Sequence, residues 1–194
     1  SSSIGPNGVV DLTTAIVVGG GLITNGGSVR LTGGSLNGSF LNNGTLLIRQ
    51  AVTMGGPLTQ DGTLRMEGAN GFTGALTVST GFTNTGIIEL TDLVAGYSAS
   101  LTVTGGALTN AVGGQIIART GANGSRTLTA TLDNQGLVTL ERAMTLNGGS
   151  AVHTNSGTIA VTGGALTLTQ SGTTPSFTNT GTIALTNAWT VTGG

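Results

Sequence analysis

The sequence predicts an all-β chain folded as a parallel β-helix, a solenoid whose short strands stack turn upon turn. Three observations support this: an Asn-x-Gly unit recurs along the chain, apolar and polar residues alternate with a period of two, and no segment shows the i, i+3, i+4, i+7 apolar spacing of a helix. Units that recur at such intervals are typical of solenoids, in which each repeat contacts only its neighbours. We therefore expect one body over residues 1–194, a segment of a longer repeat protein whose function lies on its faces.

The recurring unit consists of Asn or Gln, one or more residues, Gly, and an apolar residue shortly after. Subtracting successive Asn or Gln positions gives intervals of 17 to 26 residues, which corresponds to about eight or nine turns. The polar members are Asn25, Asn42, Gln60, Asn84, Asn110, Asn134, Asn155 and Asn179. Asn tolerates left-handed backbone geometry and bonds to nearby main chain, and stacked amides can form a ladder. We predict a structural ladder at one corner; the alternative is that these amides bind a ligand.

Each turn is expected to hold three short strands with one face buried. Residues 101–118 show the pattern, with inward Leu101 and Val103, then Leu108, then Ile116 and Ala118. In the first strand the inward set begins with Ile16 and Val18 and includes Leu76/Val78, Met144/Leu146, Leu166/Leu168 and Trp189/Val191. In the second strand it is Leu22, Phe40, Leu58, Phe82, Leu108, Leu132, Val152 and Phe177. In the third strand it also includes Val29/Leu31, Leu46/Ile48, Leu64/Met66, Ile88/Leu90, Val138/Leu140, Ile159/Val161 and Ile183/Leu185. A single turn buries too little to stand alone, so stacking must supply the common core.

Hydroxyl side chains occupy the outward positions of the first strand. One column is Thr77, Thr102, Thr129, Thr145, Thr167 and Thr190, and two residues further on stand Ser79, Thr104, Thr131, Thr169 and Thr192. Thr suits an exposed strand face because it is β-branched and polar, which explains the columns without any function. The alternative is a Thr-x-Thr array of hydroxyl and methyl groups that matches a repeating surface, such as ice or a crystalline polysaccharide.

Four turns are longer than the others, at residues 68–75, 91–100, 119–126 and 170–176. Insertions into a solenoid fall at corners and often form its binding edge. The alternative is that surface loops simply tolerate extra length.

Composition excludes several classes of function. The net charge is -1, every basic side chain is Arg, and aromatic residues make up 3% of the chain. Neither a basic field nor stacking platforms for nucleic acid are therefore present, and we expect no nucleic-acid partner. The chain has no cysteine and no apolar run near the ~20 residues of a membrane helix, so we expect no disulfide and no membrane insertion.

Few residues could carry catalysis. The only histidine, His153, follows a predicted inward residue and is expected to be exposed, and the acidic residues are scattered, so no metal or other cofactor is expected. A polysaccharide lyase or hydrolase would need carboxylates in one groove, and the nearest candidates are Glu89 and Arg65, with Arg30 earlier in the same column. We interpret these three as a weak surface charge ladder, worth under ~1 kcal/mol per pair, and predict no enzyme activity.

Segments such as Leu101-Thr-Val-Thr-Gly-Gly-Ala-Leu-Thr-Asn110 resemble the β-helical repeats of bacterial surface proteins, namely autotransporter passengers and filamentous-haemagglutinin-like adhesins. The resemblance covers almost the whole chain and implies a right-handed parallel β-helix that is secreted and projects from the cell surface. It implies host cells, matrix or glycans as partners.

The function expected from the sequence is a non-catalytic structural or adhesive module. The alternatives are ice or crystalline-polysaccharide binding through the threonine array, and, third, a polysaccharide lyase or hydrolase. Unpaired strand edges at the end turns also allow end-to-end self-association into a fibre.

Overall fold

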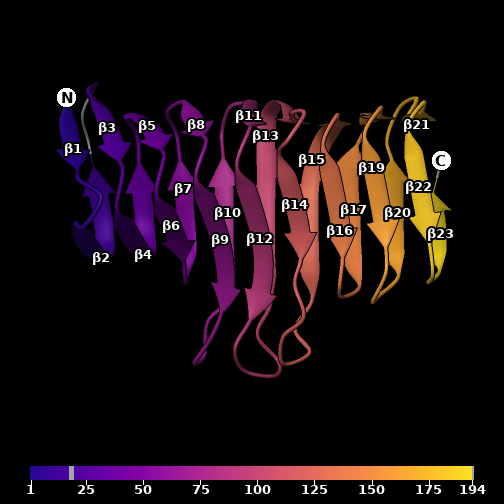
Figure 1. Cartoon of the computed structure of the whole chain (residues 1–194), viewed down its shortest axis with the longest axis horizontal. Coiled ribbons are helices and arrows are strands. Elements are labelled where there is room, and N and C mark those ends of the chain that lie inside the picture. The colour runs from indigo at the N-terminus through magenta and orange to yellow at the C-terminus, as the bar shows by residue number, and fades with distance from the viewer. Residues whose placement is uncertain (18–19, 194) are drawn as a thin grey trace.

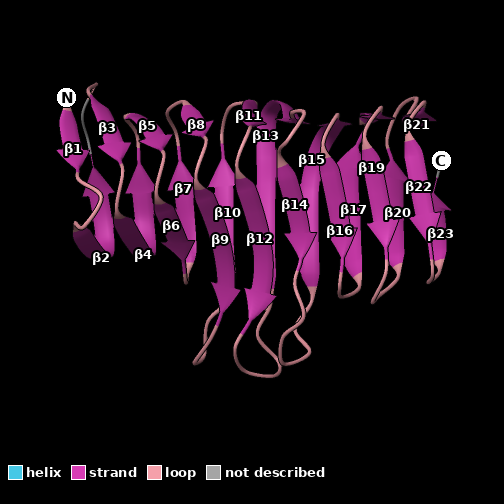
Figure 2. Cartoon of the chain, viewed as in Figure 1, coloured by secondary structure: helices cyan, strands magenta, loops and turns pink. Residues whose placement is uncertain are grey.

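The protein is a parallel β-solenoid of about eight turns, in which three faces are each built from one strand per turn (Figure 1). The computed structural model describes residues 1–17 and 20–193, with the side chains of residues 15–17 left out. Its strands form one 23-stranded sheet, and all pairings between named strands are parallel. Within the described residues every regular element is a strand, as the magenta ribbons of Figure 2 show.

Face 1 holds the strands that follow the Asn-x-Gly corner. They are the first halves of β2 (Val9–Val17) and β4 (Ser28–Leu36), then β6 (Thr45–Ile48), β9 (Thr63–Gly68), β12 (Ile87–Asp92), β14 (Gln115–Ala118), β16 (Leu137–Leu140), β19 (Thr158–Val161) and β22 (Thr182–Leu185). Face 2 follows face 1 along the chain. Its strands are the second halves of β2 and β4, then β7 (Ala51–Met54), β10 (Gly74–Val78), the first halves of β13 (Ala99–Asn110) and β15 (Arg126–Asn134), then β17 (Met144–Gly149), β20 (Leu166–Ser171) and β23 (Trp189–Gly193).

Face 3 closes each turn and ends at the next Asn or Gln. Its strands are β1 (Ser2–Ile4), β3 (Leu22–Asn25), β5 (Ser39–Asn42), β8 (Leu58–Gln60), β11 (Phe82–Asn84), the second halves of β13 and β15, then β18 (Val152–Asn155) and β21 (Ser176–Asn179). The corner between faces 3 and 1 is called the asparagine corner below. The corner between faces 1 and 2 is called the loop corner, because the connections after β9, β12 and β14 project farthest from the body there (Figure 1).

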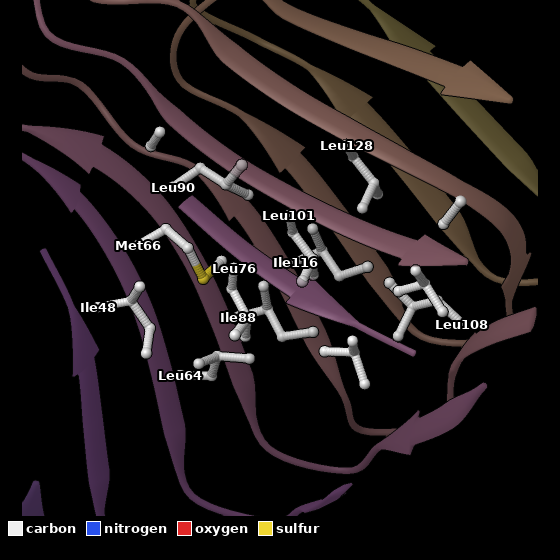
Figure 3. Packing of buried hydrophobic residues seen from close by; sticks show 14 of the residues in the cluster. Ile48, Leu64, Met66, Leu76, Ile88, Leu90, Leu101, Leu108, Ile116 and Leu128 are labelled. Carbon is white, nitrogen blue, oxygen red and sulfur yellow. The ribbon is translucent and has the colours of Figure 1, made fainter. Parts of the chain in front are cut away.

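The interior is a continuous apolar core shared by neighbouring turns. On face 1 the predicted inward residues Leu64, Ile88 and Ile116 lie in one column, and all are fully buried. Figure 3 shows these side chains meeting others from face 2, such as Leu76 and Leu101, in the same interior. The strict alternation of the sequence causes this arrangement, since every second residue of a strand points to the same side.

Two predicted inward residues of face 3 are wrong. Leu22 and Val152 are 42% and 54% exposed, while their neighbours Ile23 and His153 pair in register with the inward residues Phe40 and Phe177. The reason is the parity of the strand. Because the amide at the corner points inward, the inward position lies two residues before it, even where the more apolar residue lies three before it.

The first-strand register also differs from the prediction. Met144 pairs with Arg126, so Leu146, not Met144, shares a column with Leu128 and Leu101. The predicted inward residues Ile16 and Val18 lie outside the described side chains. No helix long and apolar enough to cross a membrane occurs in the described part of the chain.

Candidate functional site

The predicted asparagine ladder is present, and it lies inside the corner. Asn25 Nδ2 donates to Asn42 Oδ1 at 2.7 Å, and Asn42 Nδ2 donates to Gln60 Oε1 at 2.8 Å. After Gln60 a second run continues from Asn84 through Asn110, Asn134 and Asn155 to Asn179, with steps of 2.6 to 2.8 Å. All members except Asn179 are buried, so the seven buried amides bond within the fold and are not accessible to a ligand.

The ladder is interrupted once, at its glutamine. Gln60 Nε2 donates to Gly62 O and Ile87 O, and Asn84 Oδ1 is left buried without a donor among the described residues. The longer Gln side chain reaches main-chain carbonyls instead of the next amide. The left-handed backbone geometry that Asn tolerates is not used here, because none of the eight ladder residues has a positive φ. Their role is carried by the side-chain amide, which bonds both the next amide and a face 1 carbonyl, as in Asn42 Nδ2 to Thr63 O at 3.0 Å.

Glycine at the asparagine corner is required by close approach between turns. An added Cβ at Gly62 would lie 2.1 Å from Gly44 O, and one at Gly86 would lie 2.1 Å from Gly62 O. Those carbonyls accept from the next turn, as in Ile87 N to Gly62 O at 2.8 Å. Where the turn is two residues longer, the extra residues bulge outward and Gly114 keeps the place of the glycine, since Leu137 N donates to Gly114 O.

The threonine array lies on the outer side of face 2, in a register that differs from the prediction. Thr145, Thr167 and Thr190 share a column with Thr127, whereas Thr77, Thr102 and Thr129 share a column with Asn147, Thr169 and Thr192. The predicted register between β15 and β17 is therefore wrong by two residues. The correct register is more regular than the predicted one. From β7 to β23 the two columns carry, in order, Ala51/Thr53, Ala75/Thr77, Ser100/Thr102, Thr127/Thr129, Thr145/Asn147, Thr167/Thr169 and Thr190/Thr192.

Of the second predicted column, Thr169 and Thr192 belong to the array, whereas Ser79, Thr104 and Thr131 lie outside its two columns. Thr131 pairs with Ala107, because β13 has three more residues than β15 between the two paired segments. Thr104 and Thr131 instead line a shallow hollow of about 450 Å³ together with Gly106 and Gly148. The array is thus two residues wide, uncharged and half-buried to exposed.

The charged residues gather at the loop corner. Glu67 pairs with Arg49 and Arg65, Arg65 continues to Glu89 at 3.6 Å, and Glu89 pairs with Arg119 at 2.7 Å. Arg119 ends the series on Glu141 at 2.9 Å. The hydrogen bond to Glu89 is the main reason why the pKa of Arg119 is raised above its ordinary value.

This series replaces the predicted surface ladder of Arg30, Arg65 and Glu89. Arg65 and Glu89 are in register as predicted, but Arg30 is separated from them by Leu47 and pairs with Asp11. Glu67 and Glu89 are buried, so the ladder is not a superficial one. The partners that sequence reasoning missed could have been found from the residues directly after the last inward position of face 1, where Arg49, Glu67, Arg119 and Glu141 alternate in sign.

A second ion pair, between Arg126 and Asp92, is fully buried beneath the longest loops. Asp92 Oδ2 accepts from Gly124 N at 2.7 Å and Oδ1 accepts from Ala122 N at 3.1 Å, while Arg126 Nη2 donates to Arg119 O at 3.0 Å. The loop of residues 119–125 is therefore folded around this pair. Arg126 occupies an inward position of β15, and the alternation of apolar and polar residues along that strand could have predicted its burial.

The long turns at residues 68–75, 91–100 and 119–126 lie at the loop corner on consecutive turns, while 170–176 lies at the corner between faces 2 and 3.

His153, predicted to be exposed, is completely buried. Its Nδ1 accepts from Leu132 N at 3.2 Å, its Nε2 has no partner among the described residues, and burial lowers its pKa below 6.5. No group of three or more His, Asp or Glu residues placed to hold a metal ion occurs in the part of the chain that the structure describes.

Comparison with known proteins found no matching protein-family model, no matching curated protein and no matching solved structure. The fold places it in the class of parallel β-solenoid proteins.

Proposed function

We propose that the chain is a non-catalytic, extracellular segment of a bacterial surface protein, a rigid rod that displays loops and strand faces for adhesion. The observation that carries the proposal is the segregation of its parts. The asparagine corner and the core hold every turn in one register, while three long loops gather on consecutive turns at the opposite corner. Contacts made by such loops repeat at fixed spacing, so weak contacts to host cells, matrix or glycans add up by avidity.

The arrangement of ionisable groups supports the absence of catalysis. Glu67, Glu89 and Glu141 each contact arginine, and His153 lies inside the core, which leaves these groups without a place for a substrate. A lyase or hydrolase would release reducing ends from a panel of polysaccharides, and such release would contradict the proposal.

Adhesion is tested with latex beads that carry the folded chain, flowed over immobilised glycans, matrix proteins and epithelial cells. We expect retention of the beads on at least one of these surfaces, and competition by soluble chain only at high concentration. Beads that are retained no better than albumin-coated beads on all surfaces would contradict the proposal.

Sedimentation at increasing concentration tests the additional proposal that end turns associate, and a monomer at all concentrations would contradict it.

A second candidate function is favoured by the corrected register of face 2. Over seven turns the two outward columns contain only Thr, Ser, Ala and Asn, spaced ~4.8 Å between turns and about 6.6 Å along a strand. Such an uncharged lattice of hydroxyl and methyl groups suits an ordered solid such as ice.

The test of this second candidate is thermal hysteresis. Thr102→Tyr and Thr167→Tyr interrupt the lattice and are expected to abolish it, while Thr139→Tyr on the outer side of face 1 leaves it unchanged. If the intact chain shows no hysteresis but sediments with crystalline cellulose or chitin, the lattice binds polysaccharide; if it does neither, this candidate is wrong.

A further inference from the structure

A shallow depression of about 250 Å³ lies at the loop corner beside the first long loop. Its lining comes from four successive turns: Thr13 from β2, Arg30 and Thr32 from β4, Arg49 and Gln50 from the connection after β6, and Ala69, Asn70 and Phe72 from the loop after β9. It is separate from the threonine array, and none of its residues belongs to the ladder.

Phe72 is held at this depression by a tight turn. Asn70 and Gly71 both have positive φ, at 48° and 94°, and Ala69 and Phe72 exchange two main-chain hydrogen bonds of 3.0 and 3.1 Å. Two central residues with positive φ match a type I′ turn, which Asn-Gly favours. Phe72 is 50% exposed although the turn fixes its place, so an apolar residue is presented to solvent in a defined position.

The depression also has unused hydrogen-bond donors of positive charge. Arg30 pairs with Asp11 and Arg49 pairs with Glu67, one ion pair each, although a guanidinium has five N–H donors. The side chains of Arg30 and Arg49 are 45% and 29% exposed, so parts of both remain accessible beside these ion pairs. The described lining residues include two arginines and no acidic residue, which favours a ligand with a carboxylate, since guanidinium groups bind carboxylates with two parallel hydrogen bonds.

These features together define the class of ligand. A pyranose ring has an apolar C–H face, which an exposed aromatic ring can cover, and hydroxyl edges, which both donate and accept. The amides of Gln50 and Asn70 and the hydroxyl of Thr32 supply donors and acceptors for such hydroxyls. Inorganic phosphate would satisfy the arginines but would leave Phe72 unused.

We propose that this depression binds a uronic acid residue of an acidic polysaccharide, with Phe72 against the sugar ring and Arg30 and Arg49 at its carboxylate. The inference rests on the proposed adhesive function and deepens it by naming one class of partner.

The test uses the full chain and tri-galacturonic acid, with the neutral galactose trisaccharide and tri-glutamate as comparison ligands, measured by isothermal titration calorimetry and amide chemical shifts. Tri-galacturonic acid is expected to bind and to shift residues of the depression, and to bind less tightly as salt is raised. Phe72→Ala is expected to weaken binding about three- to tenfold. Arg30→Gln and Arg49→Gln are expected to weaken it about tenfold or more each.

The controls are Arg142→Gln, an arginine at a different hollow, and Val112→Ala, an exposed apolar residue at the asparagine corner. Both are expected to leave binding unchanged. Circular dichroism checks each variant for folding, and Arg30→Gln serves alone if Arg49→Gln does not fold.

Three outcomes would overturn the inference: no binding of tri-galacturonic acid at millimolar concentration, equal binding of the neutral trisaccharide or of tri-glutamate, or binding that Phe72→Ala and Arg30→Gln leave intact. The bead assay separates this failure from failure of the adhesive function. Beads that still adhere while the trisaccharide does not bind would refute only the uronic acid site.

Discussion

The asparagine corner and the loop corner solve the same problem, reversing the chain between strands, in opposite ways. At the asparagine corner nearly every turn uses Asn-x-Gly, buries the amide and bonds it to the next turn. At the loop corner the connections vary from the two residues 49–50 to the seven residues 119–125, and their contacts are ionic. The difference indicates that one corner fixes the register of the stack, while the other is free to carry length, charge and exposed apolar side chains.

The sharpest contrast between the corners is expected for glycine. Gly62→Ala places a Cβ 2.1 Å from the carbonyl oxygen of Gly44, which the backbone must move to avoid, and we expect destabilisation of more than about 3 kcal/mol. Gly71→Ala at the loop corner meets no atom within 4 Å, and its positive φ costs only about 1–2 kcal/mol. Urea unfolding followed by circular dichroism measures both. Equal losses would show that the asparagine corner is not the constrained one.

The loop corner has one element that behaves like core. Arg126→Met leaves the buried carboxylate of Asp92 without its cation, and we expect a loss of about 3–5 kcal/mol. Arg30→Met removes the half-exposed pair with Asp11 and is expected to cost less than about 1 kcal/mol. The same unfolding experiment applies, and a small effect of Arg126→Met would mean that the loop is not folded around this pair.

Two neighbouring residues test the ladder itself. Asn42→Ala removes hydrogen bonds to Asn25, Gln60 and Thr63 O from a fully buried site. We expect this to lower the free energy of unfolding by about 2–4 kcal/mol. Asn43→Ala, one residue later and exposed, is expected to change stability by less than about 0.5 kcal/mol. The ladder would lose its structural role if the two variants unfolded at the same urea concentration.

The smallest expected effect concerns the buried histidine near the end of the stack. Burial lowers the pKa of His153, so the unfolded chain binds this proton at a higher pH than the folded chain. Stability is therefore complete above the unfolded pKa near 6.5 and falls as the pH is lowered below it, by at most about 1.4 kcal/mol per pH unit. The nearest acidic residue on the neighbouring strand is Asp133, whose carboxylate accepts a hydrogen bond from Thr154 Oγ1. Asp133 pairs with Thr154 and therefore lies in the outward column, not in the inward column of His153.

The measurement is unfolding between pH 7 and pH 5 for the natural chain and for His153→Leu. The slope of the unfolding free energy against pH is expected to be smaller in the variant. An unchanged slope would assign the pH dependence to other groups.

The sequence predicts the architecture well because one rule, alternation of side chains, governs every strand. It locates the eight ladder residues, the face 1 columns from Val29 to Val161 and the places of the long turns. The errors arise where apolar character and parity disagree. Val152 is more apolar than His153, yet counting back two residues from Asn155 assigns the inward place to His153.

The candidate site was less accessible to sequence reasoning. The sequence identifies most of the threonines of the array but not their register. The register depends on which residue of β17 is matched to Leu128, and Met144 and Leu146 both fit an inward position. The alternating charges can be found in the sequence, directly after the last inward residue of face 1. The depression beside Phe72 depends on contacts between turns that are 17 or more residues apart, which composition and spacing do not reveal.

The register of stacked turns is tested most directly by cross-linking, because the natural chain has no cysteine. Thr127 and Thr145 are paired on adjacent strands, within the Cα separation that a disulfide bridges. Thr129 and Thr145 are offset by two residues, which separates their Cα atoms by about 8 Å, too far for a disulfide. The account predicts rapid oxidation of the double variant Thr127→Cys/Thr145→Cys and little of Thr129→Cys/Thr145→Cys. Faster oxidation of the second double variant would contradict the register on which the core, the ladder and the threonine array depend.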